Sequence, residues 1–407
     1  MSDCRFRVLV LARAYPNDVL PTLGLWTEQP TVRLAQSFDV RVVSPVPWCP
    51  PLPEAGPLAQ YARFRRIPRA ERRKGVEVRR PRLLVGPGTS LYALEARTYL
   101  AGVWKTVEQM HGERPFDLVH AHFIYPDGVA AHQLSRRLKI PFVVSEHAPW
   151  TGWLDRPGIA RQALPAACAA SAILAVSTSV ERTIRAYADD APRIEIVPVG
   201  VNPELFRLRP DLPRRPDQIL FVGFINYVKG VDVLLRALRL LADRGLPGRA
   251  LLIGGSFYRN TRLQEQELRA LAERLQLGDR VAFLGRRPPE DVARLMAESA
   301  VVVLPSRAES FGAVLVEALA CGTPVVATRC GGPEDIVSRD VGMLVSVDDV
   351  EGLAESLSVM LARRSEYDPS ELRAYAVERF SWPTVTKDIE RAYRRVLGSP
   401  SNGAGGQ

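Results

Sequence analysis

The sequence lacks the features that mark a membrane-spanning or secreted protein. It has no run of about 18 apolar residues, the length that a transmembrane helix needs. Its five cysteines are scattered, an odd number without the spacing of a metal site or a disulfide framework. We therefore expect reduced thiols and a cytoplasmic location. The segment Arg5–Arg13 is too short and too charged for a signal peptide and predicts a first buried strand.

Several functional motifs are missing as well. No Gly-x-Gly-x-x-Gly follows the first strand, which disfavours an oxidoreductase with a dinucleotide cofactor. Repeats of the kind that build solenoids are not visible. Cys321 ends an apolar helical pattern, so we expect a small packed side chain there rather than a nucleophile.

The positive charge is concentrated in one stretch. Residues 61–82 contain ten basic and two acidic residues, a net charge of +8, whereas the whole chain carries +9. Three interpretations stay open: a solvated loop, a patch facing an anionic membrane or phosphorylated acceptor, and a nucleic-acid site. The last is disfavoured because no recognisable nucleic-acid module surrounds the stretch, so we expect no nucleic-acid partner.

Both halves of the chain alternate short apolar runs with helical patterns, which indicates the α/β class with parallel sheets. The clearest strands are predicted at 8–12, 40–44, 118–120, 142–145, 173–176, 194–197, 219–222, 250–253, 281–284, 301–304 and 324–327, and helices at 231–243, 263–275, 290–298 and 351–361. Three prolines interrupt the pattern within 207–217, which we predict to be a linker.

Two carboxylates flank a predicted strand-to-helix junction in the second half. Glu309 follows the strand at 301–304, and Glu317 lies about one and a half turns into a helix predicted from Gly312 to Cys321. Ser310 is a candidate N-cap, and Gly312 allows a ligand to approach the backbone closely. A helix N-terminus suits a phosphate, and carboxylates accept hydrogen bonds from sugar hydroxyls. Together these residues predict a site for a nucleotide sugar.

The Glu309-x7-Glu317 pattern resembles the donor-site motif of retaining glycosyltransferases of family 4. The resemblance spans nearly the whole chain before the tail. It rests on the residues that follow and precede the motif, namely Ala318–Thr328, Gly331–Glu334, Phe221–Gly223 with Lys229–Gly230, Ile196–Pro198 with Gly200, and Asp117–His122.

The resemblance implies the GT-B fold, with two Rossmann-like domains whose parallel sheets face each other across a cleft. The N-terminal domain, 1–206, would take the acceptor, and the C-terminal domain, 218–380, would bind the nucleotide sugar. A helix at 381–397 would cross back to the first domain, and we expect residues 398–407 to be a disordered tail.

The resemblance also implies roles for individual residues. Glu309 would orient the transferred sugar, Glu317 would bind the ribose, and Lys229 would stabilise the departing diphosphate. His122 would lie near the reacting centre, and His147 would line the acceptor side. Further donor contacts are expected from Gly24, Arg287, Ser310, Phe311 and Gly312.

Two features bear on the diphosphate site. Family members usually carry a basic residue where this chain has Phe224, so Lys229 would act alone with helix amides, or Arg329 or Arg287 would substitute. The chain has no Asp-x-Asp in the position that metal-dependent transferases of the other fold use. We therefore expect no metal and no cofactor besides a UDP- or GDP-linked sugar as co-substrate.

The sequence thus predicts a retaining, metal-independent hexosyltransferase of polysaccharide or glycoconjugate biosynthesis. Its acceptor would be a glycan, a lipid-linked molecule or a small molecule, and the enzyme would be cytoplasmic, with Arg63–Arg82 as a candidate contact to the inner membrane face. The alternatives are a transferase-like binding subunit without turnover, which Phe224 favours, and another GT-B enzyme such as a phosphorylase or a sugar-nucleotide epimerase.

Overall fold

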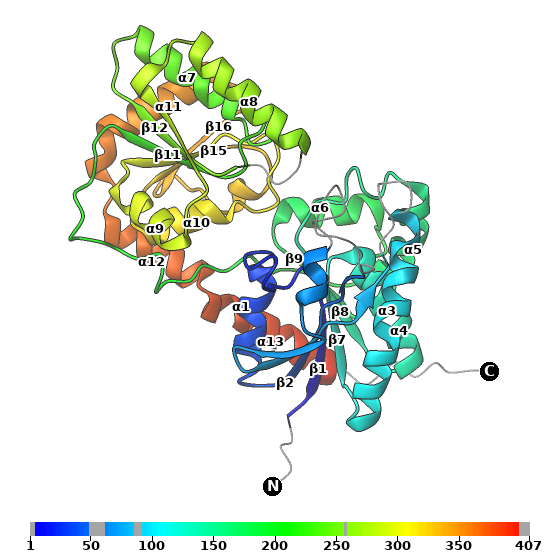
Figure 1. Cartoon of the computed structure of the whole chain (residues 1–407). Coiled ribbons are helices and arrows are strands. Elements are labelled where there is room, and N and C mark those ends of the chain that lie inside the picture. Colours follow the sequence, from blue (N-terminus) through cyan, green and yellow to red (C-terminus); the bar gives the residue numbers. More distant parts are fainter. Residues whose placement is uncertain (1–4, 49–61, 85–91, 256–258, 399–407) are drawn as a thin grey trace. The chain divides into compact units, whose positions relative to one another are not determined.

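The computed structural model describes residues 5–48, 62–84, 92–255 and 259–398, and every statement below concerns these residues. The chain forms two compact units: Met1–Pro198 together with Val385–Gln407, and Val199–Thr384. Each unit is a sheet of mainly parallel strands with helices on both faces (Figure 1). The predicted tail lies outside the described residues from 399 onward.

The first unit is built on an eight-stranded sheet with the order β10-β9-β8-β7-β1-β2-β5-β4. All neighbouring strands are parallel except β4 and β5, which form an antiparallel hairpin at one edge. The strands are β1 (Arg7–Leu11), β2 (Asp39–Val43), β4 (Ala70–Arg73), β5 (Val76–Arg79), β7 (Leu118–His122), β8 (Phe142–Glu146), β9 (Ala172–Ala175) and β10 (Ile194–Ile196). A separate two-stranded ladder pairs β3 (Val46–Pro47) with β6 (Arg82–Leu83).

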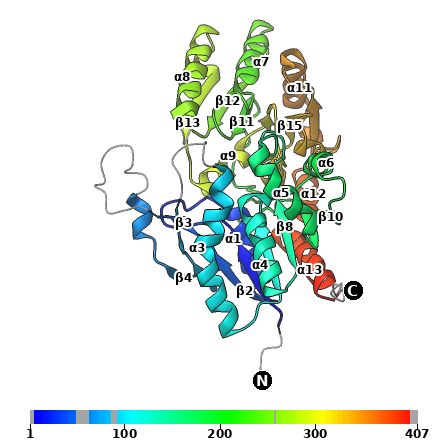
Figure 2. The same ribbon diagram turned by 90° about the vertical axis from the view of Figure 1, so that its right-hand side faces the viewer.

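Helices cover both faces of this sheet, because the central strands are buried on both sides and need cover. Figure 2 shows the same layers from the side, with α3, α4 and α5 grouped together. The C-terminal helix α13 packs on the segment between α1 and β2, where the ring of Tyr393 lies 5.3 Å from that of Phe38. The helices are α1 (Leu25–Leu34), α3 (Tyr92–Glu113), α4 (Val129–Leu138), α5 (Pro157–Ala169), α6 (Thr178–Tyr187) and α13 (Trp382–Gly398).

The second unit has a six-stranded, fully parallel sheet with the order β13-β12-β11-β14-β15-β16. Helices α7, α8 and α11 cover one face, and α9, α10 and α12 cover the other (Figure 1). The strands are β11 (Gln218–Val222), β12 (Arg249–Ile253), β13 (Val281–Gly285), β14 (Val301–Leu304), β15 (Val325–Thr328) and β16 (Gly342–Val345). The helices are α7 (Val231–Asp243), α8 (Arg259–Arg274), α9 (Pro289–Glu298), α10 (Ala313–Ala320), α11 (Val350–Arg363) and α12 (Pro369–Phe380).

The predicted α/β class with parallel sheets is confirmed, and every predicted strand and helix is present with shifts of a few residues at the ends. The stretch 207–217 contains neither helix nor strand and lies in the second unit. The last helix returns to the first unit from Val385 onward. Among the described residues, no helix combines the length and apolarity required to cross a bilayer.

The basic stretch is not the simple loop that one interpretation expected. It contains a short 3-10 helix (Arg63–Arg66) followed by the β4–β5 hairpin. Alternation explains the hairpin: Val76 and Val78 face inward and are buried, whereas Glu77 and Arg79, which alternate with them, are partly exposed. Loop predictions based on charge alone missed this period-two pattern.

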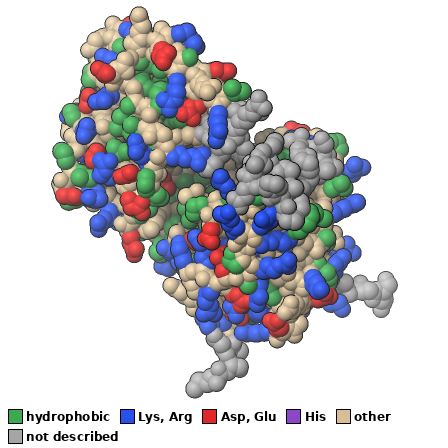
Figure 3. All heavy atoms as spheres, in the orientation of Figure 1, with side chains coloured by type: hydrophobic (Ala, Val, Ile, Leu, Met, Phe, Trp, Pro, Cys, Tyr) green, Lys and Arg blue, Asp and Glu red, His purple; other side chains and the backbone are tan. Residues whose placement is uncertain are grey.

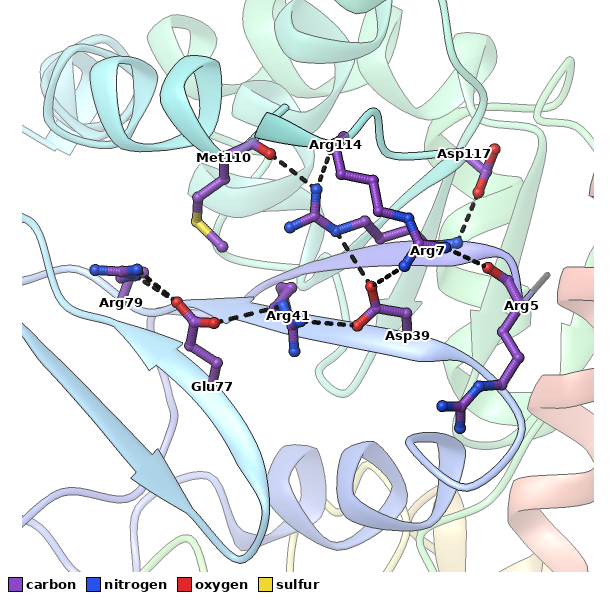
Figure 4. Close-up of polar contacts among 9 residues, drawn as sticks. All are labelled: Arg5, Arg7, Asp39, Arg41, Glu77, Arg79, Met110, Arg114 and Asp117. Carbon is purple, nitrogen blue, oxygen red and sulfur yellow. Dashed lines mark hydrogen bonds and ion pairs between the residues drawn. The ribbon is translucent and has the colours of Figure 1, made fainter. Parts of the chain in front are cut away.

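A network of ion pairs fastens the amino ends of the central strands in the first unit (Figure 4). Asp39, the first residue of β2, accepts ion pairs from Arg7 at 3.4 Å, Arg41 at 3.2 Å and Arg114 at 3.0 Å. The Arg7 guanidinium also donates to the Met110 carbonyl at 2.8 Å. Burial lowers the pKa of Arg7 from its ordinary value, an effect that Asp39 opposes.

We predict that Asp39→Asn destabilises the first unit. The substitution leaves buried Arg7 without its carboxylate, and breaking a buried pair by removing one partner costs about 3–5 kcal/mol. The measurement is the melting temperature by calorimetry. Glu366→Gln is the matched control, because Glu366 pairs with Arg363 in solvent and its loss should leave the melting temperature unchanged. Equal melting temperatures for wild type and Asp39→Asn would contradict a stabilising role for this network.

Candidate functional site

The strand order of the second unit reverses between β11 and β14. In an open parallel sheet, a crevice forms outside the carboxyl ends of the two strands at such a switch point, and ligands bind there. The loop after β11 runs through residues 223–230, and the loop after β14 runs through residues 305–312. Five of the predicted donor-site residues lie on these two loops, namely Lys229, Glu309, Ser310, Phe311 and Gly312.

An ion pair joins the two loops. The Nζ of Lys229 lies 2.5 Å from Oε1 of Glu309, whose side chain is only 11% exposed. The Ser306 hydroxyl donates to the same oxygen at 2.8 Å. Glu309 is also anchored through its backbone, because its carbonyl accepts the Gly332 N–H at 2.9 Å. The second carboxylate oxygen of Glu309 has no hydrogen-bond donor among the described residues and stays available to a ligand.

Two contacts hold the loops at this separation. Gly230 adopts a left-handed conformation with φ 65°, and a Cβ there would lie 1.8 Å from the Pro305 carbonyl oxygen. Arg307 makes two 2.8 Å hydrogen bonds to the Asp232 carboxylate at the start of α7, and pairs with Asp348 at 2.6 Å. The hydrogen bonds that Arg307 donates to Asp232 raise the pKa of Arg307 above its ordinary value, although partial burial opposes this. Arg307 therefore positions the loop that carries Glu309.

The start of α10 differs from the prediction. Ser310 was expected to be the N-cap, but the N-cap is Gly312, which has φ 96° and offers no side-chain cap. The reason is that Glu309 pairs with Gly331 in a parallel bridge, so the chain stays extended there. The helix begins only after the buried Phe311. Gly312 then makes the turn into the helix. The first N–H groups of α10 receive no side-chain cap, and such groups with the helix dipole favour an anion.

Glu317 lies on the second turn of α10, as predicted. Its carboxyl has no hydrogen-bond or ion-pair partner among the residues that the structure describes. The residue keeps some exposure, yet burial of the carboxyl raises its pKa to about 8. A buried, unpaired carboxyl is costly to ionise, and it gains most from a ligand that brings hydroxyl donors.

A cavity of about 540 Å³ opens at the carboxyl ends of β12 and β13. Arg262, Arg269 and Arg286 line it, together with Gly254 and Gly285 at the ends of these two strands. Arg287, one of the predicted donor contacts, is exposed and does not line the cavity, whereas its neighbour Arg286 does. Lys229 and Glu309 lie outside this cavity as well, so we base the candidate site on the switch point.

Arg287 and Arg329 are the candidates to replace the basic residue that family members carry at the position of Phe224, and their surroundings differ. Arg329 donates to the Leu344 carbonyl at 2.9 Å, which directs its guanidinium to β16. Phe224 itself is an exposed side chain on the loop after β11. Within the described part of the loops at the switch point, Lys229 is therefore the basic residue that contacts Glu309.

The corresponding switch point of the first unit lies between β1 and β7. Gly24 is the N-cap of α1, and a Cβ there would meet the Ala14 carbonyl oxygen at 2.1 Å. His122 ends β7, and its Nδ1 lies 2.9 Å from Nε2 of His147, with the two rings stacked. Burial lowers the pKa of His122 well below its ordinary value and that of His147 to about 3. Both rings are therefore neutral at physiological pH, and one N–H lies between them.

The neighbouring polar residues have structural surroundings. His120 contacts the Tyr393 hydroxyl at 2.6 Å and the Ser145 hydroxyl at 2.8 Å, which attaches β7 to α13 and β8. Glu146, next to His147, accepts the Ile124 N–H and the Trp150 indole N–H, both at 2.9 Å. The expected packed thiol is confirmed, because Cys321 is buried and burial raises its pKa to about 12.

Sequence reasoning missed Ser306, Arg307 and Asp232, which hold Glu309 and its loop. A signal existed for two of them. Asp232 occupies the first turn of a helix that begins next to Lys229, where an acid is favoured, and an arginine between Pro305 and Glu309 is a natural partner for it. No local signal marks Ser306, because its partner is set by the turn of the loop.

Two family profiles match adjacent parts of the chain. Residues 31–205 match "Glycosyltransferase Family 4", and residues 204–379 match "Glycosyl transferases group 1". The chain is 34% identical over 357 residues to the D-inositol 3-phosphate glycosyltransferase of Frankia alni, covering 81% of this chain and 86% of that protein. It is 31% identical to the enzyme of the same name from Mycobacterium marinum, covering 80% and 73%.

Solved structures share the fold at lower identity. Sucrose-phosphate synthase from Thermosynechococcus elongatus superposes with a TM-score of 0.78 at 20% identity, covering 97% of this chain and 100% of the other. HepE from Anabaena, solved in complex with UDP, superposes with a TM-score of 0.73 at 21% identity, covering 96% and 100%. The predicted GT-B fold class is confirmed by these similarities and by the two parallel sheets.

The raised pKa of Glu317 predicts a pH-dependent stability. Its ordinary pKa is 4.5 and its folded-state value is about 8, so the stability that the protonated form provides is complete below pH 4.5 and is lost as the pH rises through 8. Glu317→Gln keeps a neutral group of the same shape. The variant should melt higher than wild type above pH 8, and the difference should vanish near pH 4.5. Thermal melts across this range check it, with exposed Glu355→Gln as the control. A difference that does not depend on pH would contradict the prediction.

Proposed function

We propose a donor and a reaction for this chain, which belongs to glycosyltransferase family 4 and is a glycosyltransferase. The donor is a nucleotide-linked hexose that binds the second unit at the β11–β14 switch point. The observation that carries the proposal is the cluster of Lys229, Ser306 and Glu309 beside the uncapped start of α10. It offers a cation and amides to a diphosphate, and a carboxylate to a sugar.

The roles follow the chemistry of the groups. Lys229 and the first amides of α10 stabilise the charge that develops on the departing nucleoside diphosphate. The second oxygen of Glu309 accepts a hydrogen bond from a hydroxyl of the transferred sugar, and Glu317 accepts hydrogen bonds from the ribose hydroxyls. Arg286 or Arg287 borders the base. UDP is the favoured nucleotide because HepE, which shares the fold, was solved with UDP and with UDP-glucose, and GDP is the alternative.

The reaction is a retaining transfer without a metal ion. The bond between the anomeric carbon and the phosphate oxygen breaks, and a bond to the acceptor hydroxyl forms on the same face. The acceptor proton passes to the leaving phosphate. The paired neutral histidines, His122 and His147, support placing the acceptor at the first unit, because neutral imidazoles exchange hydrogen bonds with hydroxyls.

The acceptor is a hydroxyl of a glycan, a lipid-linked sugar or a small polyol. The names of the relatives make a phosphorylated cyclitol one candidate for the small polyol, and the reaction would serve glycoconjugate or polysaccharide biosynthesis. A cytoplasmic location fits the free cysteines Cys168, Cys321 and Cys330.

The function is tested by incubating the chain with UDP- and GDP-hexoses in excess EDTA and following nucleotide release and the anomer of the product. We expect turnover with retained configuration. Glu309→Gln and Lys229→Met should each lower turnover about 10- to 100-fold, since each removes a charge-assisted contact of about 1.5–3 kcal/mol. Glu355→Gln, on an exposed face of α11, should retain full activity.

The alternatives give different results in the same assay. Nucleotide binding without turnover would indicate a binding subunit. An inverted product, or activity that Mg²⁺ restores after chelation, would contradict retention or metal independence. Full activity of Glu309→Gln would contradict the site.

We also propose peripheral association with an anionic membrane through a smaller part of the basic stretch than the charge count suggests. Arg73 and Lys74 pair with buried Glu28, and Arg80 is buried and pairs with Glu71. The exposed arginines of the stretch are Arg63, Arg65, Arg66, Arg69 and Arg72. Lys and Arg side chains are numerous on the face of the first unit shown in Figure 3.

Exposed apolar side chains adjoin this basic surface. Trp48 and Leu84 are 51% and 63% exposed, and they directly follow the paired strands β3 and β6. Arg82 of β6 donates to the Ile67 carbonyl at 2.5 Å, which joins these strands to the segment carrying Arg65. An amphipathic residue such as Trp beside cationic side chains suits the headgroup region of an anionic bilayer.

Liposome co-sedimentation tests this contact. Replacing four arginines by Gln should weaken binding to phosphatidylserine liposomes and flatten its salt dependence, because each cation near the surface contributes about 1 kcal/mol. The four are Arg65, Arg66, Arg69 and Arg72. The matched control removes the same charge from scattered exposed positions, namely Arg182, Arg244, Arg249 and Arg339. Equal loss in both variants would show a net-charge effect, and no binding by wild type would contradict the proposal.

A further inference from the structure

An aromatic pair stands exposed on the first unit. The rings of Tyr92, at the start of α3, and Trp153, just before α5, are 5.7 Å apart and inclined at 62°. Trp153 is 47% exposed. The guanidinium carbon of Arg156 lies 5.4 Å from the Trp153 ring centre and 5.7 Å from that of Tyr92. That guanidinium is exposed and has no hydrogen-bond or ion-pair partner in the described part of the chain.

The turn that carries Trp153 is rigidly held, so the exposure of the indole is not the result of a loose loop. Trp150 is buried and donates its indole N–H to Glu146 at 2.9 Å, and Leu154 is buried as well. Asp155 accepts the Gly152 N–H at 2.9 Å and the Tyr187 hydroxyl of α6. Tyr and Trp are enriched at binding interfaces, because each combines an apolar ring with a polar group that stays hydrated.

The platform, defined here as Tyr92, Trp153 and Arg156, lies at the carboxyl edge of the first sheet. Helix α3 leads into β7 and helix α5 leads into β9, so both helices begin at the edge where the parallel strands end. The Gln162 side chain donates to the Ala93 carbonyl at 2.8 Å, which ties the beginnings of these two helices together. The same edge carries His122 and His147.

We propose that this platform is a saccharide-binding subsite of the acceptor. The inference rests on the proposed function, and it narrows the acceptor to a molecule that carries a sugar ring besides the one that is glycosylated. The apolar face of a pyranose packs on the indole, and its hydroxyls accept hydrogen bonds from Arg156. The platform adds a contact that an acceptor consisting of one ring, such as a cyclitol phosphate, would not use.

A sugar suits this surface better than a lipid does. An acyl chain packed on the rings would remove water from the Arg156 guanidinium without offering it an acceptor, and burying an unpaired charge is costly. A saccharide supplies both an apolar face and oxygen acceptors within one ring. The membrane contact proposed above uses a different set of residues, around Trp48 and Leu84.

The test measures saccharide binding directly with the full chain. Wild-type protein is applied to immobilised short bacterial oligosaccharides, and the affinity for each bound oligosaccharide is then measured by calorimetry. Trp153→Ala should weaken binding about tenfold, Trp153→Phe should restore most of it, and Arg156→Gln should weaken it less. The matched control is Phe6→Ala, which truncates another half-exposed aromatic side chain of the same unit and should bind like wild type.

Donor binding is measured in parallel by the thermal shift with UDP-glucose, so the two proposals fail separately. Loss of the UDP-glucose shift in wild type would contradict the proposed donor and leave the saccharide result standing. Intact donor binding together with no oligosaccharide bound would overturn the platform. Equal affinity of Trp153→Ala and wild type for the same oligosaccharide would also overturn it. A loss of liposome binding in Trp153→Ala, with saccharide binding unchanged, would reassign the surface to a membrane contact.

Discussion

Parallel strand pairing is the constraint from which the rest of the structure follows. It brings every carboxyl end of a sheet to one edge, and it requires helices to return the chain across both faces. The two edges of the first sheet are used differently. The amino edge is closed by ion pairs around Asp39, whereas the carboxyl edge carries the histidine pair and the aromatic platform. The ion pairs and the proposed acceptor contacts thus lie at opposite ends of the strands.

The second unit holds its site with charges that satisfy one another before any ligand arrives. Arg307 is neutralised by Asp232 and Asp348, so it fixes the loop geometry without competing for an anion. Glu317 is treated differently: burial, with no partner among the described residues, raises its pKa to about 8, so the carboxyl is mostly protonated at neutral pH. The Glu309 carboxylate is thus paired with Lys229, whereas the Glu317 carboxyl is buried and has no partner among the described residues. A residue placed this way lowers the stability of the free protein and strengthens contacts made only with a ligand.

The sequence predicted the layer architecture, the order of strands and helices, and the two loops that meet in the second unit, because these depend on apolar periodicity and on short motifs. It did not predict the N-cap of α10, since the bridge between Glu309 and Gly331 joins segments that only the folded sheet brings together. Nor did it predict which basic residues form ion pairs. Arg73 and Lys74 pair with Glu28, which is remote in the chain, and Arg80 pairs with Glu71. A charge count treats all ten basic residues alike, and burial separates them. The roles of the site residues, including Gly24, Arg287 and His147, stay predictions.

The ion pair between Lys229 and Glu309 links the two ends of the proposed donor site. In the free protein each neutralises the other, and Ser306 holds the shared carboxylate oxygen in place. Under the proposed function, a diphosphate brings two negative charges to Lys229 and competes for its ammonium group, which frees the paired oxygen of Glu309 in addition to the one already open to a sugar hydroxyl. Under the same proposal, this exchange would allow Phe224 to stand where a second basic residue is expected. A second cation would hold the diphosphate without disturbing the pair, whereas with Lys229 as the cation in contact with Glu309, capture of the diphosphate and release of the carboxylate are one event.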